Sequence, residues 1–196
     1  MHLLVDSTGL KLCGAGEGLV EKHGANTRRS WRKLHIGVDA NTGEILAAKL
    51  TTKDVDDAAQ VGALLDQVEG PVASFTADGA YDQDRVYSAV TDRDPQAVVI
   101  VPPRLTAVLS GTAETEPTQR DGHLQSIAEK GRMNWQKASG YNKRARVESA
   151  IGRYKQVIGD GLRFRKDERR ATEVGVAIHV LNRMLALGRP NSVRVI

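Results

Sequence analysis

The chain has 196 residues, of which 40% are hydrophobic and 27% charged, a composition that excludes a disordered tail and is typical of a single globular domain over residues 1–196. It contains no apolar run of the ~20 residues needed to cross a bilayer, and its first residues lack the charged and apolar regions of a signal peptide, so we expect a cytoplasmic protein with no membrane partner. The single cysteine, Cys13, excludes an internal disulfide framework and a multi-thiolate zinc site.

The net charge of +4 is unevenly distributed along the chain. Residues 130–170 hold 13 of the 28 basic side chains and only 4 of the 24 acidic ones, which leaves 15 basic and 20 acidic residues elsewhere. A basic segment on an otherwise slightly acidic chain indicates a surface that binds a polyanion such as nucleic acid. The alternative is a basic surface that is simply solvated.

Over most of the chain, apolar residues recur at the spacing that is typical of strands or helices. Alternating residues, turn formers at 41–43 and compact apolar runs indicate strands. Apolar residues at helical spacing, closed by glycine and proline, indicate helices. The predicted order is strand 2–6, hairpin 34–50, helix 55–68, strand 72–77, helix 83–92, strand 97–101, helix 144–158 and helix 171–187.

One long segment, residues 102–140, is polar, rich in turn formers and without a clear period. It is long for a structureless connection in a compact domain, so we interpret it as a functional or mobile segment. An early antiparallel hairpin followed by alternating strands and helices predicts an α/β fold, in which helices flank a mixed five-stranded sheet. Ribonuclease-H-like nucleases share this order of elements.

Two aspartates lie at the carboxyl ends of predicted strands. Asp6 ends the first strand, and Asp78 directly follows the strand at 72–77. Ligands bind at this edge of α/β sheets, and two carboxylates brought together there tolerate each other when a divalent cation lies between them. Hard oxygen ligands suit magnesium or manganese. The alternative is local: Asp6 opens a turn, and Asp78 closes a strand before Gly79.

A third carboxylate lies on the predicted helix 144–158. Tyr141, Arg144, Glu148 and Lys155 fall within roughly 60° of one another on a helix surface, and a separate apolar stripe faces the sheet. A carboxylate between two cations on one stripe suits a metal ligand beside groups that clamp phosphate. The alternative is an Arg144–Glu148 surface pair worth a few tenths of a kcal/mol.

Four groups of residues carry a resemblance to a known family. They are Asp-Ser-Thr-Gly at 6–9, Trp-Arg-Lys-Leu-His at 31–35 with Val38-Asp39-Ala40, Asp78-Gly79-Ala80-Tyr81, and the spacing of Tyr141, Arg144, Glu148 and Lys155. The sequence resembles the DDE transposases of bacterial insertion-sequence family 5 from about residue 2 to residue 195. The last spacing matches the family pattern at every position and is its most specific motif.

The resemblance implies a ribonuclease-H-like domain in which Asp6, Asp78 and Glu148 form the catalytic, metal-binding triad. It also implies two divalent ions, Mg²⁺ or Mn²⁺, about 3.5–4 Å apart, that serve cleavage and transfer of DNA strands. The partners implied are transposon ends and target DNA, with Tyr141, Arg144 and Lys155 handling the end, a homo-oligomer on DNA, and association with the nucleoid. Relatives carry a DNA-binding region ahead of the first aspartate, so we expect this chain to be a catalytic domain without that region.

Other basic and aromatic residues are weaker candidates for contacts with DNA. Arg32 and Lys33 accompany Trp31, and Trp135 is a candidate for stacking on an unpaired base. For both groups the alternative is packing at the edge of the core. Two other functions remain open: a ribonuclease-H-like nuclease without strand transfer, and an inactive DNA-binding or interaction fragment of a transposase.

Overall fold

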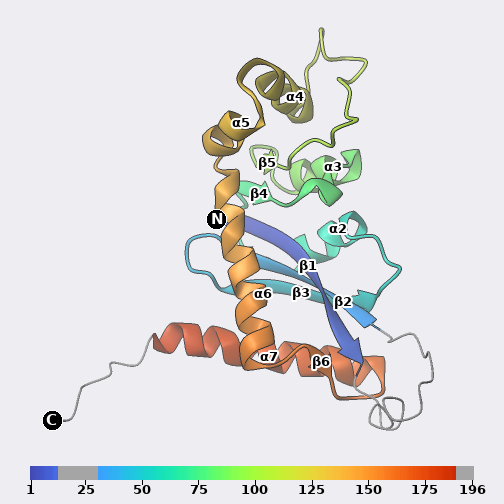
Figure 1. The fold of residues 1–196 in the computed structure, drawn as a ribbon, viewed down its shortest axis with the longest axis vertical. Coiled ribbons are helices and arrows are strands. Elements are labelled where there is room, and N and C mark those ends of the chain that lie inside the picture. Colours follow the sequence, from blue (N-terminus) through green and yellow to red (C-terminus); the bar gives the residue numbers. More distant parts are fainter. Residues whose placement is uncertain (13–30, 189–196) are drawn as a thin grey trace, which may run out of the picture.

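The computed structural model describes residues 1–12 and 31–188, so Cys13 lies outside the described residues. A mixed sheet with strand order β3-β2-β1-β4-β5 forms its centre, and β6 pairs with the far end of β1 (Figure 1). The strands are β1 (His2–Leu12), β2 (Trp31–Asp39), β3 (Ile45–Thr52), β4 (Ser74–Thr76), β5 (Val98–Ile100) and β6 (Gly161–Leu162). The predicted mixed α/β architecture is confirmed, with six strands in place of five.

Helices and short 3-10 turns connect and cover the strands. They are η1 (Ala58–Gln60), α2 (Val61–Leu65), η2 (Gly79–Tyr81), α3 (Asp84–Arg93), α4 (Gln119–Lys130), α5 (Arg132–Ser139), η3 (Tyr141–Arg144), α6 (Ala145–Val157) and α7 (Asp167–Leu187). In the part of the chain that the structure describes, no helix combines the length and apolar character that crossing a membrane requires.

The sheet is antiparallel on one side and parallel on the other. β1 pairs antiparallel with β2 along nearly its whole length, and β2 pairs antiparallel with β3. β4 and β5 run parallel to β1, and β4 pairs with only the first residues of that strand. Because strands alternate their side chains, β1 sends Leu3 and Val5 to one face of the sheet and Leu4 and Leu10 to the other.

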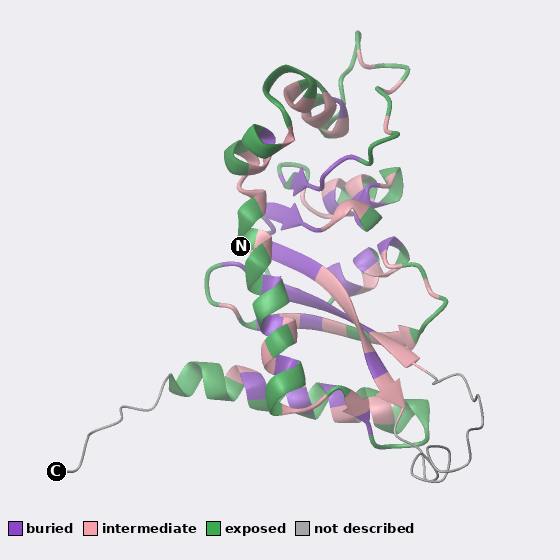
Figure 2. Ribbon diagram, viewed as in Figure 1, coloured by how far each residue is buried: buried purple, intermediate pink, exposed green. Residues whose placement is uncertain are grey.

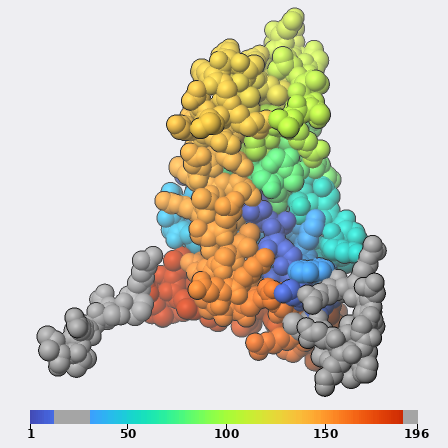
Figure 3. Space-filling model, viewed as in Figure 1, coloured from blue at the N-terminus to red at the C-terminus, as the bar shows by residue number. Residues whose placement is uncertain are grey.

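Each face of the sheet has its own hydrophobic core. One core packs beneath α2 and α3 and includes Phe75, Leu64 and Val86. The other packs beneath α6 and α7 and includes Val147 and Leu181. Figure 2 shows these buried stretches running through the strands and along the inner sides of the helices. In the space-filling view, α6 covers the front of the sheet and leaves part of β1 visible beside it (Figure 3).

Several predicted bounds differ from the structure. β1 continues to Leu12, so Asp6 lies within a strand and not at its end. The predicted helix 55–68 is reduced to η1 and α2, and in the turn before them the carbonyl of Val55 and the carboxylate of Asp57 accept hydrogen bonds from Lys33 of β2. The last helix begins four residues earlier than predicted, at Asp167, whose carboxylate pairs with Arg32. β6 is too short for a periodic pattern to indicate it.

The segment 102–140 differs most from its prediction, because α4 and α5 occupy its second half. Each helix buries a single residue: Asp121 in α4 and Trp135 in α5. Neither helix therefore carries the repeating apolar stripe that predicts helices from sequence. Thr118 caps α4, and its hydroxyl accepts from the amide of Asp121 while the Asp121 carboxylate accepts from the amide of Thr118.

Candidate active site

The register of the parallel strands places Asp6 beside Asp78. The last residue pair between β1 and β4 joins Leu4 to Thr76, and each aspartate lies two residues beyond it. Beyond this point β4 ends, and β1 has no strand partner on that edge until β6 pairs with Lys11. Both carboxylates therefore emerge where the parallel pair opens, which is the carboxyl edge of β4. The sequence predicted that Asp6 lies at the end of the first strand. In the structure it lies within β1, beside the carboxyl end of β4.

Local hydrogen bonds hold both aspartates. One oxygen of Asp6 accepts from the amide of Ser7 at 2.8 Å, which leaves the other oxygen directed away from the strand. Asp78 caps η2, and its carboxylate accepts from the amide of Ala80 at 2.9 Å. The side chain of Asp6 is 14% exposed and that of Asp78 38%. Asp6 thus forms the inner wall of the site and Asp78 its open side.

Helix α6 brings the third carboxylate over the same edge. The chain leaves α5 through Gly140, whose left-handed backbone (φ 74°) allows the reversal into η3. α6 then buries Val147, Ala150 and Tyr154 against the sheet. Glu148 lies in the first turn of α6, on the flank toward Asp6 and Asp78, and its side chain is 58% exposed.

One guanidinium group joins all three carboxylates. Nη2 of Arg144 donates to Asp6 at 2.7 Å and lies 3.6 Å from a carboxylate oxygen of Asp78. Nη1 of the same side chain donates to Glu148 at 2.5 Å. The sequence predicted Arg144 beside Glu148, and the structure places it at the centre of the three acids. A single cation therefore accounts for the convergence of carboxylates from β1, η2 and α6.

The site is electrostatically unbalanced, because three carboxylates face one cation. Burial raises the pKa of Asp6 above its ordinary value, Arg144 opposes that rise, and the charges of Asp78 and Glu148 add to it. Burial lowers the pKa of Arg144, but the carboxylates, Asp6 foremost, raise it by more. Nε of Arg144 is buried and has no hydrogen-bond partner among the described residues. The arrangement attracts additional positive charge.

The donor set suits a hard divalent cation. Carboxylate oxygens are the ligands that Mg²⁺ and Mn²⁺ take in proteins, and three of them are directed at one cationic group here. Over residues 1–12 and 31–188, no three acidic, histidine or cysteine side chains are arranged to ligate a metal directly, because Arg144 lies between the acids. A metal ion held by these three carboxylates would therefore have to take the place of the guanidinium.

Next to the acids, a line of aromatic side chains supports Tyr141. Its ring lies 5.8 Å from that of Trp135, and burial raises the pKa of its hydroxyl while the Arg144 guanidinium lowers it. The indole N–H of Trp135 donates to Nδ1 of His123 at 3.1 Å, and the other ring nitrogen of His123 donates to the carbonyl of Val99 at 2.7 Å. This chain of contacts connects β5 to Tyr141.

Two residues of this line change the sequence-based interpretation. Trp135 is only 2% exposed, so it packs in the interior and its ring is not presented to an unpaired base. Its burial agrees with the alternative, packing at the edge of the core, and His123 supplies the hydrogen-bond partner that a buried indole needs. His123 is not among the residues predicted from the sequence, and only the fold brings it to Trp135.

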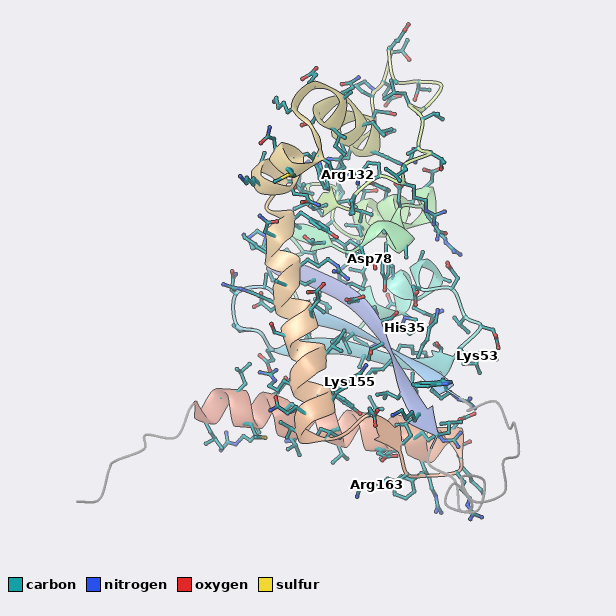
Figure 4. All side chains as sticks on the ribbon, viewed as in Figure 1. His35, Lys53, Asp78, Arg132, Lys155 and Arg163 are labelled. Atoms are coloured by element: carbon teal, nitrogen blue, oxygen red, sulfur yellow. The ribbon has the colours of Figure 1, made fainter. Side chains whose placement is uncertain are left out.

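The remaining predicted contacts with DNA are dispersed. Lys155 is exposed two turns beyond Glu148, about 10 Å along α6, and Figure 4 shows it lower on that helix. Arg32 pairs with Asp167 at the start of α7. Lys33 projects from the opposite face of β2 and pairs with Asp57 at 3.2 Å. Arg32 and Lys33 therefore do not form one basic surface, since neighbouring residues of a strand face opposite sides.

A comparison with protein families shows the family of the chain. The family model described as the transposase DDE domain matches residues 1–185 of the chain. The match includes both aspartates, the helix that carries Glu148 and the whole sheet. The predicted kinship with transposases is thus confirmed: this chain belongs to the family of transposase DDE domains.

Proposed function

We propose that this chain is the catalytic domain of an insertion-sequence transposase, and that Asp6, Asp78 and Glu148 are its catalytic carboxylates. The observation that carries the proposal is their convergence on the guanidinium of Arg144, at 2.5–3.6 Å, from three elements far apart in the sequence. A structural ion pair needs one acid for one base, whereas three acids around one base leave a negative site that a divalent cation completes.

Each residue has a distinct part in this proposal. Asp6, Asp78 and Glu148 would hold Mg²⁺ or Mn²⁺, and two such ions, when bound, supply an activated nucleophile and stabilise the leaving oxygen of a phosphodiester. Arg144, released from the carboxylates, would remain beside them and contact a DNA phosphate through its planar fork of donors. Tyr141, held from behind by Trp135, would contact the sugar or phosphate next to the cut.

Three features support the finer assignment. The order β3-β2-β1-β4-β5, antiparallel and then parallel, agrees with a ribonuclease-H-like fold. The spacing of Tyr141, Arg144, Glu148 and Lys155 agrees with insertion-sequence family 5. α6 and the flanking segments form the most basic part of the chain, which suits DNA as the partner. We further propose that the protein acts as a homo-oligomer on nucleoid DNA in the cytoplasm.

The proposal is tested with isosteric variants that remove one charge each. Asp6→Asn, Asp78→Asn and Glu148→Gln should each abolish Mn²⁺-dependent cleavage of DNA and leave DNA binding nearly unchanged. Asp92→Asn serves as the control, since Asp92 is exposed on α3 outside the site and forms no ion pair within the described chain. Cleavage near the wild-type rate in any triad variant would remove that residue from the catalytic set.

Two further measurements separate the alternatives. Incubating the protein with a pre-cut end and a target duplex detects strand transfer, and products of cleavage without joined products would indicate a nuclease. Thermal denaturation with and without Mn²⁺ addresses an inactive fragment. A chain whose melting temperature does not respond to Mn²⁺ would be a DNA-binding remnant and not an enzyme.

A further inference from the structure

A cavity of about 480 Å³ opens next to the turn that carries Asp78. Its lining residues are Gly79, Pro102, Pro103, Arg104, Leu105, Thr106 and Arg132. Gly79 directly follows Asp78, so the cavity borders the candidate active site on the side of α5. In Figure 4, Arg132 lies above Asp78, at the level where this helix begins. None of the roles proposed above uses these lining residues.

Two arginines of the cavity lack acidic partners. Arg132 donates from Nη2 to the carbonyl of Pro103 at 2.9 Å. Arg104 makes two long contacts, both 3.4 Å, from its guanidinium to the carbonyls of Gly79 and Ala80. Within residues 1–12 and 31–188, neither arginine forms a salt bridge. Two positive charges therefore face one opening, held by main-chain oxygens that leave most of their donors available.

The backbone around the arginines is fixed. The amide of Arg104 donates to Asp82 at 2.9 Å, and the same carboxylate pairs with Arg120 of α4. A Cβ at Gly79 would lie 3.4 Å from the carbonyl of Pro102, so the turn after Asp78 packs directly on the cavity wall. These contacts connect the loop that begins at Pro102 to the turn of Asp78, and a ligand in the cavity would lie at a set position relative to the carboxylates.

The other walls are apolar. Pro102 and Pro103 are buried, whereas Leu105 is 94% exposed at the mouth. An exposed leucine beside two unpaired guanidinium groups suits a ligand with an anionic group and an apolar or sugar surface. A nucleotide of a DNA strand has this combination, because its phosphate accepts bidentate hydrogen bonds from arginine and its deoxyribose packs on aliphatic side chains.

We propose that this cavity binds a backbone phosphate and the attached deoxyribose of a DNA strand, next to the phosphate cut at the carboxylates. The assignment rests on the proposed function, since that function makes DNA the substrate. Arg104 and Arg132 contact the phosphate, and Leu105 covers the sugar. The contact carries no base specificity and sets the position of the strand relative to Asp78.

The test measures binding of a short fluorescein-labelled duplex with a single-stranded end, by anisotropy, in EDTA and over a range of salt concentrations. Arg132→Gln and Arg104→Gln keep a hydrogen-bond donor for the carbonyls and remove the charge. Each should weaken binding roughly 3- to 10-fold at low salt and lower the slope of log K against log salt by about 0.7–0.9, the value for one phosphate contact.

A second pair of variants avoids changes to the arginines. Leu105→Glu places a carboxylate at the mouth of the cavity, at a position too exposed to affect folding, and should weaken binding by about 10-fold. Val108→Glu is the matched control: Val108 is 75% exposed on the same loop and does not line the cavity. Equal losses in Leu105→Glu and Val108→Glu would overturn the proposal, as would wild-type binding by Arg132→Gln.

The design separates this proposal from the proposed function. If the wild-type chain does not cleave DNA with Mn²⁺ but the cavity variants lose affinity and salt slope, the phosphate site stands and the transposase assignment fails. If the wild-type chain cleaves DNA and the cavity variants bind with an unchanged slope, only the phosphate site is refuted.

Discussion

Replacing Arg144 with alanine tests the central feature of the site, a guanidinium that lies among three carboxylates. The side chains of Arg144 and Asp6 are 16% and 14% exposed, so the variant leaves a mostly buried carboxylate without its partner. Removing one partner of a buried pair costs about 3–5 kcal/mol, and partial exposure places this case near 3 kcal/mol. The contact with the exposed Glu148 adds only about 0.3–0.5 kcal/mol.

In a domain of this size, a loss of about 3 kcal/mol lowers the melting temperature by roughly 6–12 °C. The pKa of Asp6 should also rise further, because Arg144 is the largest influence that lowers it. Arg146→Ala is the matched control: Arg146 lies on the other flank of α6, donates a hydrogen bond to the carbonyl of Ala40 and forms no salt bridge within the described residues. Its melting temperature should fall by much less.

The same variant should bind divalent ions more tightly. In the wild-type chain an incoming ion has to displace Arg144, and a displacement that costs about 1.4–3 kcal/mol weakens the apparent affinity roughly 10- to 100-fold. Mn²⁺ titrations followed by thermal denaturation should therefore saturate at lower concentrations in Arg144→Ala than in the wild-type chain. Equal Mn²⁺ midpoints in the two proteins, or a melting temperature unchanged in EDTA, would refute this reasoning.

Three further predictions concern other parts of the molecule. Trp135→Ala should destabilise the chain by about 3–5 kcal/mol in urea denaturation, with or without DNA, because Trp135 is buried; a loss below 1 kcal/mol would contradict its interior position. Hydrogen bonds from Ser110 and then from Thr118 hold the pKa of Asp121 below its ordinary value, so its carboxylate stabilises the fold above pH ~4 and that contribution is lost as the pH falls further. Asp121→Asn should be clearly less stable than the wild-type chain at pH 7, and the difference should shrink as the pH falls below ~4; a constant difference would be inconsistent with this linkage. Lys155→Ala should lower the salt slope of DNA binding by about 0.7–0.9 at an unchanged melting temperature, whereas the exposed Lys49 on β3 serves as a control whose substitution leaves the slope unchanged.

Much of the site was predictable because it depends on local patterns. Alternation over 34–38 and the apolar run before Asp78 identified strands, and α/β topology placed Asp78 at the carboxyl edge of its strand. Asp6 reaches the same edge from within β1, two residues beyond the last pair of β1 with β4. The helical spacing of residues 144–155 placed Glu148 and Lys155 on a flank distinct from the buried stripe. These inferences need only the spacing of apolar residues along the chain and the direction of the strands.

Contacts between distant residues were not predictable in the same way. A helical period shows that Arg144 and Glu148 share a face, but it contains no information about Asp6, which lies 138 residues away and meets Arg144 only when α6 packs on β1. Burial of Trp135 likewise depends on His123 and Tyr141, and α4 and α5 are stabilised by single buried residues that leave no period in the sequence.

The amino-acid order therefore specified which acids lie at the sheet edge and which helix carries the third. Packing alone decided that one guanidinium lies among them, and that two more arginines without acidic partners face a cavity beside Asp78. The physical reason is the separation of the interacting residues along the chain. Backbone periodicity depends on neighbours a few residues apart, whereas the pairing of charges depends on distances in space that are set only when the sheet and helices pack together.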